Sequence, residues 1–194
     1  MSFNDSDTFY NLLAAFMEES KVRNKYEFYA ERAESDGLYV LKDIFQKTAD
    51  NEKEHAKLWY KALNDQEILS EPENLIEAAK QEHYEHDVIY ANYAAKALEE
   101  GYIDIAHKFE MVAQIEKLHA QRFEQYLEEF RSGTLFSKTN ETNWICTKCG
   151  YETMSMEAPM VCPICEHSKG YFQVAYNQGQ QTKGSPTSKA NKGN

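Results

Sequence analysis

The stretch Thr48-Ala-Asp-Asn-Glu-Lys-Glu-His-Ala56 contains the pattern Glu-x-x-His, and the same pattern recurs 64 residues later as Glu116-Lys-Leu-His119. On a helix, residues three apart project from one face, so each pair presents a carboxylate and an imidazole side by side. A single pair of this kind is common on exposed helices and indicates little. Two copies in equivalent places indicate a shared chemical role.

The two patterns belong to a longer internal repeat with the same offset. Identical residues match across the two halves: Tyr26 and Tyr90, Tyr29 and Tyr93, Ala30 and Ala94, Ala33 and Ala97, Gly37 and Gly101, Phe45 and Phe109, Ala49 and Ala113, and Leu63 and Leu127. Chance alignment rarely keeps tyrosine, glycine, glutamate and histidine in register together. The repeat therefore predicts two similar helix hairpins related by a pseudo-two-fold axis.

Helix-breaking residues are sparse and regularly placed between segments whose apolar residues recur at helical spacing. Asp36-Gly37 and Glu100-Gly101 end two of these segments, and Ser70-Glu71-Pro72 opens another. The pattern predicts helices at 5–35, 38–63, 72–99 and 102–131. The expected fold class is therefore an all-α four-helix bundle, which occupies residues 1–133.

The repeat slips by one residue in the third predicted helix. Glu19 lies seven residues before Tyr26, whereas Glu82 lies eight residues before Tyr90. A single inserted residue in a helix is often accommodated as a π-bulge, and such bulges are frequent at functional sites. We expect a bulge between Glu82 and Tyr90 that turns Glu85 toward a bound metal.

Glu19 and Glu82 occupy matching positions on the first and third predicted helices, each about 33 residues before a Glu-x-x-His pair. One Glu from each of two helices and a Glu-x-x-His pair from each of the others form the ligand set of di-metal carboxylate bundles. Glu52 and Glu116 are then able to bridge two metals, and iron or manganese suits such ligands. The alternative, a buried ion network without metal, would cost several kcal/mol per group.

The cysteines form two pairs, Cys146-x-x-Cys149 and Cys162-x-x-Cys165, and the chain has four in total. This spacing is a strong signal for a metal held by four thiolates, although it does not distinguish zinc from iron. We expect a small metal domain at 144–178, a linker at 134–143 and a disordered tail at 179–194. Metal thiolates rather than disulfides indicate a reducing compartment, the cytoplasm.

Charge and composition exclude several classes of partner. The formal net charge of −11 argues against nucleic acid or an anionic membrane as the main partner. No apolar run approaches the roughly 18 residues of a membrane span, and no signal peptide is expected. The chain has no Gly-rich dinucleotide motif, so electrons for redox chemistry are expected from a separate protein.

At this point the sequence resembles the rubrerythrin family over roughly residues 5–176. The resemblance rests on the cysteine module and on four runs: Ala15-Phe-Met-Glu-Glu-Ser-Lys-Val-Arg-Asn-Lys-Tyr26, Thr48–Ala56, Glu82-His-Tyr-Glu-His86 and Ile115–His119. It implies a ferritin-like di-iron bundle followed by a rubredoxin-like domain with one further iron. The implied activity is a non-haem peroxidase that reduces hydrogen peroxide to water in oxidative-stress defence.

The resemblance also implies a role for each site residue. Glu19 is a terminal ligand of the first iron, Glu52 and Glu116 bridge, and Glu82 and His119 serve the second iron. The first iron exchanges Glu85 for His55 on reduction. Tyr26 and Tyr90 either bond ligand carboxylates or peroxide through their hydroxyls, or simply pack in the core. Electrons pass through Cys146, Cys149, Cys162 and Cys165.

The resemblance further implies partners: a separate NAD(P)H-dependent reductase or rubredoxin as electron donor, and a second copy in a head-to-tail homodimer. Two other functions remain open. One is a ferroxidase or iron-handling ferritin-like protein, which has little need of the cysteine iron. The other is a metal-sensing or adaptor bundle with a structural zinc ribbon.

Overall fold

The structure, a computed structural model, describes residues 2–175, and the predicted tail at 179–194 lies outside that range. The chain divides into two compact units, the first ending at Glu73 and the second beginning at Asn74. Within residues 2–175, no helix has the length and apolar character that crossing a membrane requires.

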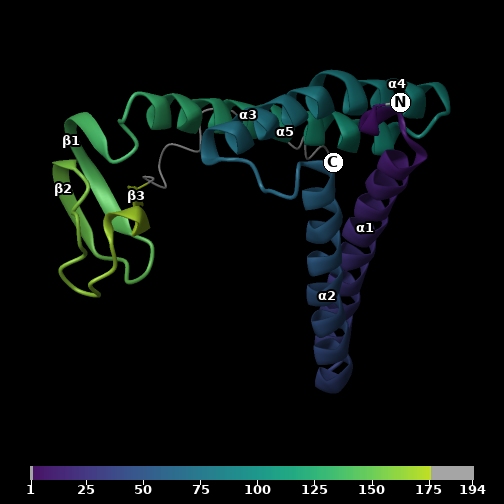
Figure 1. The fold of residues 1–194 in the computed structure, drawn as a ribbon, viewed down its shortest axis with the longest axis horizontal. Helices are drawn as coiled ribbons and strands as arrows, with labels where there is room; N and C mark the ends of the chain where they lie inside the picture. The colour runs from purple at the N-terminus through teal and green to yellow at the C-terminus, as the bar shows by residue number, and fades with distance from the viewer. Residues whose placement is uncertain (1, 176–194) are drawn as a thin grey trace, which may run out of the picture. The chain divides into compact units, whose positions relative to one another are not determined.

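In the first unit, the long helices α1 (Asp7–Ser35) and α2 (Tyr39–Leu63) run antiparallel as a hairpin (Figure 1). A 3₁₀ turn, η1 (Phe3–Asp5), precedes them, and Ser6 caps α1 by accepting a hydrogen bond of 3.2 Å from the Phe9 amide. The turn passes through Gly37, whose φ of +72° favours glycine. The first predicted hairpin is confirmed.

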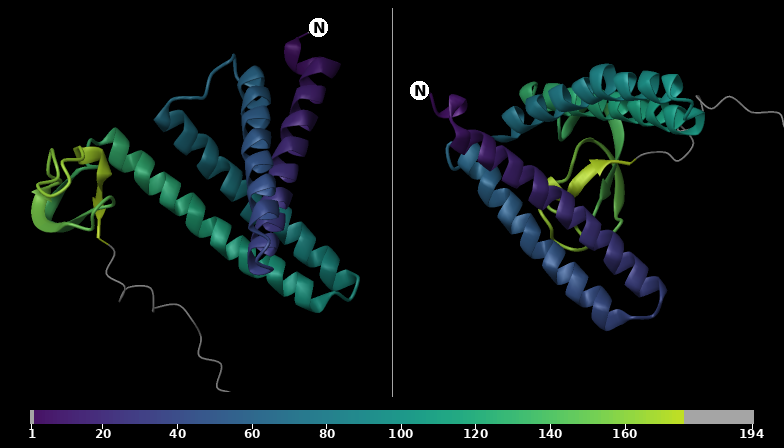
Figure 2. Two further views of the ribbon diagram at one scale, coloured as in Figure 1. Left: turned by 90° about the horizontal axis from the view of Figure 1, so that it is seen from below. Right: turned by 90° about the vertical axis from the view of Figure 1, so that its right-hand side faces the viewer.

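A long helical run, whose first residues precede the boundary at Asn74, and a helix that folds back against it form the helical part of the second unit (Figure 2). The run comprises α3 (Glu71–Tyr84), the π-helix η2 (Glu85–Tyr90) and α4 (Ala91–Glu99), and α5 (Ile103–Arg131) runs antiparallel to it. The π-helix lies between Glu82 and Tyr90, as the slip in the repeat predicts. The single helix expected at 72–99 is therefore three elements, because the inserted residue widens one turn.

Alanine lines the seam of both hairpins. The buried residues of α1 and α2 are Ala30, Ala33, Ala49 and Ala56, and the matching Ala94, Ala97, Ala113 and Ala120 are buried in the second hairpin. A methyl side chain lets two helix backbones approach closely, because no larger group separates them. The sequence repeat is therefore also a repeat of packing, and the candidate ligands of each hairpin lie on equivalent pairs of closely packed helices.

The rest of the second unit is a small domain with a sheet of β1 (Ser137–Cys146), β2 (Glu152–Glu157) and β3 (Phe172–Val174), in the order β2-β1-β3 and all antiparallel. Trp144 is fully buried at its centre, and its indole N–H donates to the Ser155 carbonyl at 3.1 Å. Strand β1 begins at Ser137, inside the range expected as a linker at 134–143. The small core consists of Trp144, Cys146, Ala158, Cys162 and Phe172.

Candidate metal centres

The first cluster of candidate ligands joins α1 to α2. Glu52 and His55 lie one turn apart on α2, and the His55 Nδ1 is 2.8 Å from a Glu52 carboxylate oxygen and 3.8 Å from one of Glu19. One ligand atom from each of these residues lies within 4.8 Å of the others. The hairpin thus brings together the glutamate of the first helix and the Glu-x-x-His pair of the second.

The second cluster repeats this arrangement in the other unit. His119 Nδ1 lies 2.7 Å from a carboxylate oxygen of Glu116, also on α5, and 3.4 Å from one of Glu82 on α3. These groups also lie within 4.8 Å of one another. Each hairpin therefore assembles two carboxylates and an imidazole, a set of oxygen and nitrogen donors that suits iron.

The electrostatics of the second cluster favour a cation. Partial burial raises the pKa of Glu82, and the neighbouring Glu116 carboxylate raises it further through a hydrogen bond and charge repulsion, while His119 opposes the rise. Burial likewise raises the pKa of Tyr90, and the charges of Glu85 and Glu116 add to it. Crowded carboxylates of this kind are stabilised when a positive ion lies among them.

Glu85 is the first residue of the π-helix η2, and its carboxylate accepts a hydrogen bond of 2.8 Å from the Gln81 amide. It is not part of the group that includes Glu82, Glu116 and His119. It lies close enough to Tyr90 to influence that residue's pKa. The π-helix is where the sequence places it, and the role of Glu85 as a ligand stays a prediction.

Tyr26 and Tyr90 pack in matching aromatic clusters. The Tyr26 ring centroid is 6.3 Å from that of Phe45, and the Tyr90 centroid is 6.0 Å from that of Phe109. Tyr29 and Tyr93 complete the two clusters. This packing accounts for both rings, and a catalytic role of their hydroxyls stays a prediction.

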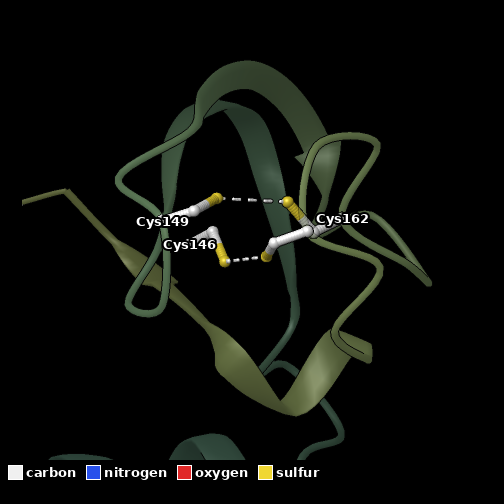
Figure 3. Close-up of side chains that lie close together, drawn as sticks. Cys146, Cys149 and Cys162 are labelled. Atoms are coloured by element: carbon white, nitrogen blue, oxygen red, sulfur yellow. Dashed lines mark hydrogen bonds between the residues drawn. The ribbon is translucent and has the colours of Figure 1, made fainter.

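The four cysteine sulfurs converge in the small domain (Figure 3). Two come from each Cys-x-x-Cys turn, or knuckle: the first is 146–149 and the second is 162–165. The Sγ atoms of Cys146 and Cys165 are 3.7 Å apart, and those of Cys149 and Cys162 are 3.6 Å apart. A disulfide would need about 2.0 Å. Ligands at about 2.3 Å from a tetrahedral metal lie roughly 3.8 Å from one another. The spacing therefore fits a single tetrathiolate ion.

Backbone amides point at these sulfurs in a repeated pattern. The Tyr151 amide donates to Cys149, and the His167 amide donates to Cys165 at the equivalent place of the other knuckle. Burial raises the pKa of the Cys162 thiol, but N–H groups of Cys165 and Ile164, together with the side chains of Cys165 and Cys149, outweigh this and bring it to about 6. Amide bonds stabilise the thiolate form that binds metal, but burial and the neighbouring sulfurs outweigh them at Cys149 and Cys165, whose pKa values are raised.

His83 and His86 belong to neither of the two Glu–His clusters. The Nε2 of His83 lies 2.8 Å from a carboxylate oxygen of Glu124 on α5, and both side chains are partly exposed. His86 is mostly covered, its Nε2 is 3.5 Å from Asp87, and its Nδ1 has no hydrogen-bond partner among the described residues.

Comparison with known proteins shows relatives of both the helical part and the cysteine domain. The family model for rubrerythrin matches residues 10–127, and the model for the rubrerythrin rubredoxin-like domain matches residues 144–173. Rubrerythrin of Nitratidesulfovibrio vulgaris is 38% identical over 184 residues, covering 89% of this chain and 96% of that protein. Rubrerythrin-1 of Clostridium acetobutylicum is 36% identical over 188 residues, with coverage of 89% and 96%.

Among solved structures, nigerythrin in a mixed-valence state is 28% identical and covers 88% of this chain and 87% of that one, with a TM-score of 0.34. That score is too low for a comparison of overall shape.

Paired Glu–His clusters on helix hairpins, followed by a four-thiolate domain, define a non-haem di-iron oxidoreductase with an attached rubredoxin-like domain. The chain belongs to the rubrerythrin family. The predicted fold class and the predicted iron cofactors, a di-iron centre and one iron at the four cysteines, are confirmed. The zinc-ribbon alternative is thereby disfavoured.

Proposed function

We propose that this protein is a peroxidase that reduces hydrogen peroxide to water. The reaction consumes one peroxide, two electrons and two protons and yields two waters. The observation that carries the proposal is that one chain holds both kinds of iron ligand, the Glu–His clusters and the four cysteines. The bound di-iron centre supplies two electrons and Lewis acidity.

We propose that both hairpins contribute ligands to that centre. We assign Glu19 as a terminal ligand of the first iron, Glu82 and His119 as ligands of the second, and Glu52 and Glu116 as bridges. His55 is 55% exposed, and Glu85 lies at the start of a π-helix. An exposed side chain and a widened helical turn both permit movement, which supports the proposed exchange of Glu85 for His55.

The remaining residues proposed as catalytic are Tyr26 and Tyr90. Partial burial and nearby carboxylates raise the pKa of Tyr90, so its hydroxyl keeps its proton and is able to donate a hydrogen bond. The matching place of Tyr26 in the repeat suggests the same role beside the first iron. Each ring is held by its aromatic cluster, which would fix the direction of the hydroxyl.

The cysteine iron is proposed to pass electrons to the di-iron centre. Cys149 is exposed, whereas Cys146 and Cys162 are buried, so one side of the tetrathiolate site reaches the surface. Electrons are proposed to come from a separate NAD(P)H-dependent reductase or a rubredoxin. We also propose a head-to-tail homodimer, in which the small domain of one copy serves the other, and a cytoplasmic location.

The test is NAD(P)H consumption on addition of hydrogen peroxide, coupled through a reductase and rubredoxin, with the iron-loaded full chain. Glu52→Ala should abolish turnover while leaving the absorption of the cysteine iron intact. Cys149→Ser with Cys162→Ser should abolish turnover while leaving the di-iron absorption. Turnover of the double cysteine variant at the wild-type rate would contradict the relay. Rapid oxidation of Fe(II) by oxygen without peroxide turnover would favour a ferroxidase.

A further inference from the structure

A cavity of about 420 Å³ lies along the first hairpin, between α1 and α2. Its lining includes three cationic side chains, Arg23, Lys53 and Lys57, and no carboxylate. The hydroxyl of Ser20 and the ring of Tyr60 also line it. In a chain with a formal net charge of −11, a cavity whose charged lining residues are all cations is a local reversal of the overall charge.

The internal repeat provides a comparison within the same chain. At the positions that match Lys57 and Tyr60, the second hairpin has Gln121 and Glu124. The carboxylate of Glu124 is paired with His83, whose Nε2 lies 2.8 Å away. Ser20 occupies the place that matches His83, counted from the paired ligands Glu19 and Glu82. At these matching positions the second hairpin therefore has a neutral side chain and an ion pair, whereas the first hairpin has a lysine and no carboxylate.

The cationic groups of the cavity are incompletely matched by their own surroundings. Arg23 donates to Glu27 at 2.8 Å through one terminal nitrogen, but its Nε is buried without a hydrogen-bond partner among the described residues. Lys57 has a loose pairing with Glu54 at 3.6 Å. No ion pair of Lys53 is recorded within residues 2–175. The ammonium groups of Lys53 and Lys57 therefore keep donors that a ligand in the cavity is able to use, while the buried Arg23 Nε adds to the local positive charge.

We propose that this cavity binds a small phosphate-bearing anion. A phosphate group carries up to two negative charges near neutral pH and three strong acceptor oxygens, which suits a guanidinium and two ammonium groups. The rings of Phe16 and Tyr60, with centroids 5.6 Å apart, and the exposed Ile68 provide an apolar wall for an attached organic body. The cavity size is within the usual range for small-molecule sites.

The lining of the cavity contains none of the proposed iron ligands, although Arg23 lies one turn after Glu19 on α1. Ser20 follows Glu19 and Lys53 follows Glu52, so each is rotated about 100° around its helix from the ligand before it. The inference therefore does not depend on the peroxidase activity, and it fails or stands independently of that activity.

The test uses the iron-loaded full chain, titrated by calorimetry with inorganic phosphate and with phenyl phosphate, at an ionic strength held constant with sodium chloride. Wild type should bind saturably, and the double variant Lys53→Gln/Lys57→Gln should bind roughly tenfold more weakly. Lys117→Gln is the matched control, because Lys117 is the counterpart of Lys53 in the second hairpin. Its affinity should equal that of wild type. Tighter binding of phenyl phosphate would indicate an organic phosphate, and equal binding would indicate phosphate itself.

Three results would overturn the proposal. One is a response to chloride alone that matches the response to phosphate. Another is undiminished phosphate binding by the double variant, because phosphate held at the iron would not depend on these lysines. The third is an equal loss in Lys117→Gln, which would show a general charge effect. Both lysines are exposed, so the variants should retain wild-type circular dichroism.

Discussion

The two cysteine knuckles have the same backbone but differ in the residue that follows. Gly150 has a φ of +76° and Glu166 a φ of +59°, so both are left-handed. Each donates its amide to the carbonyl of the first cysteine of its pair, at 2.8 Å from Gly150 to Cys146 and at 3.0 Å from Glu166 to Cys162. The second knuckle therefore adopts the glycine conformation with a residue that has a Cβ.

The cost of that choice sets the expected effect of Glu166→Gly. A non-glycine residue in the left-handed region costs about 1–2 kcal/mol, and glycine loses about 0.5–1 kcal/mol more backbone entropy on folding. Glu166→Gly should therefore stabilise the small domain by up to about 1 kcal/mol. Gly150→Ala should destabilise it by a similar amount. A Cβ at Gly150 would meet nothing within 4 Å, so backbone strain is its main cost.

The measurement is denaturant unfolding of the iron-loaded full chain, followed by the thiolate-to-iron absorption because that signal reports on the small domain. Gly170→Ala is the matched control, since Gly170 does not have a positive φ and a Cβ there also meets nothing within 4 Å. It should be neutral or slightly stabilising. The reasoning is refuted if Glu166→Gly lowers the unfolding midpoint, or if Gly150→Ala raises it.

Three further predictions concern the helices and the sheet. Ala49→Leu, at a fully buried seam position, should lower the free energy of unfolding by about 1–3 kcal/mol through overpacking. Asp50→Leu, at the exposed neighbouring position, should lower it far less, and thermal unfolding followed by circular dichroism compares the two variants. Deleting Val88 should restore a regular helix through 85–90 and lower peroxide turnover. The thiolate-to-iron absorption should persist, and unchanged turnover would contradict a role for the π-helix. Trp144→Phe should destabilise the small domain by about 1–3 kcal/mol, because the Ser155 carbonyl loses its donor and the core loses volume. The measurement is the rate at which a chelator removes iron, which should rise in the variant.

The helical part was predictable because several independent signals agreed. Gly37 and Gly101 mark the turns, and both adopt the positive φ that glycine permits. The π-helix followed from a shift of one residue between Glu82 and Tyr90, because a wider turn accommodates an inserted residue while both flanking residues keep their places in the repeat. The helix starts differ by a residue or two from expectation, because capping groups such as Ser6 decide them locally.

The small domain was less predictable beyond its metal site. The domain was expected to begin at Trp144, but β1 begins at Ser137, which already pairs with Glu157 of β2 ahead of a shift in register before Thr142. Glu166 takes the same left-handed conformation as Gly150 although it has a Cβ, and its amide donates to the Cys162 carbonyl as that of Gly150 donates to Cys146. Residue preferences alone do not predict a left-handed glutamate, because the local hydrogen bond decides the conformation.

The cationic cavity was not predicted at all, although a signal existed in the repeat. Its lysines look like solvated helix positions when each helix is read alone, and the cavity exists because α1 and α2 bring them together. The difference between Tyr60 and Glu124 at matching positions was the available clue.

The inserted residue also separates the chemistry of the two hairpins. Each hairpin holds a similar Glu–His cluster on a similar alanine seam, so without the insertion the two metals would have closely matched surroundings. The π-helix of the second hairpin adds Glu85, and the first hairpin has Val22 three residues after Glu19 where the second has Glu85 three residues after Glu82. A carboxylate replaces an apolar side chain at one of two otherwise equivalent sites, so the extra negative charge is available on one side of the pair. We propose that this extra carboxylate is what allows Glu85 to replace His55 when the cluster is oxidised, because a carboxylate stabilises an oxidised metal more than a neutral imidazole does.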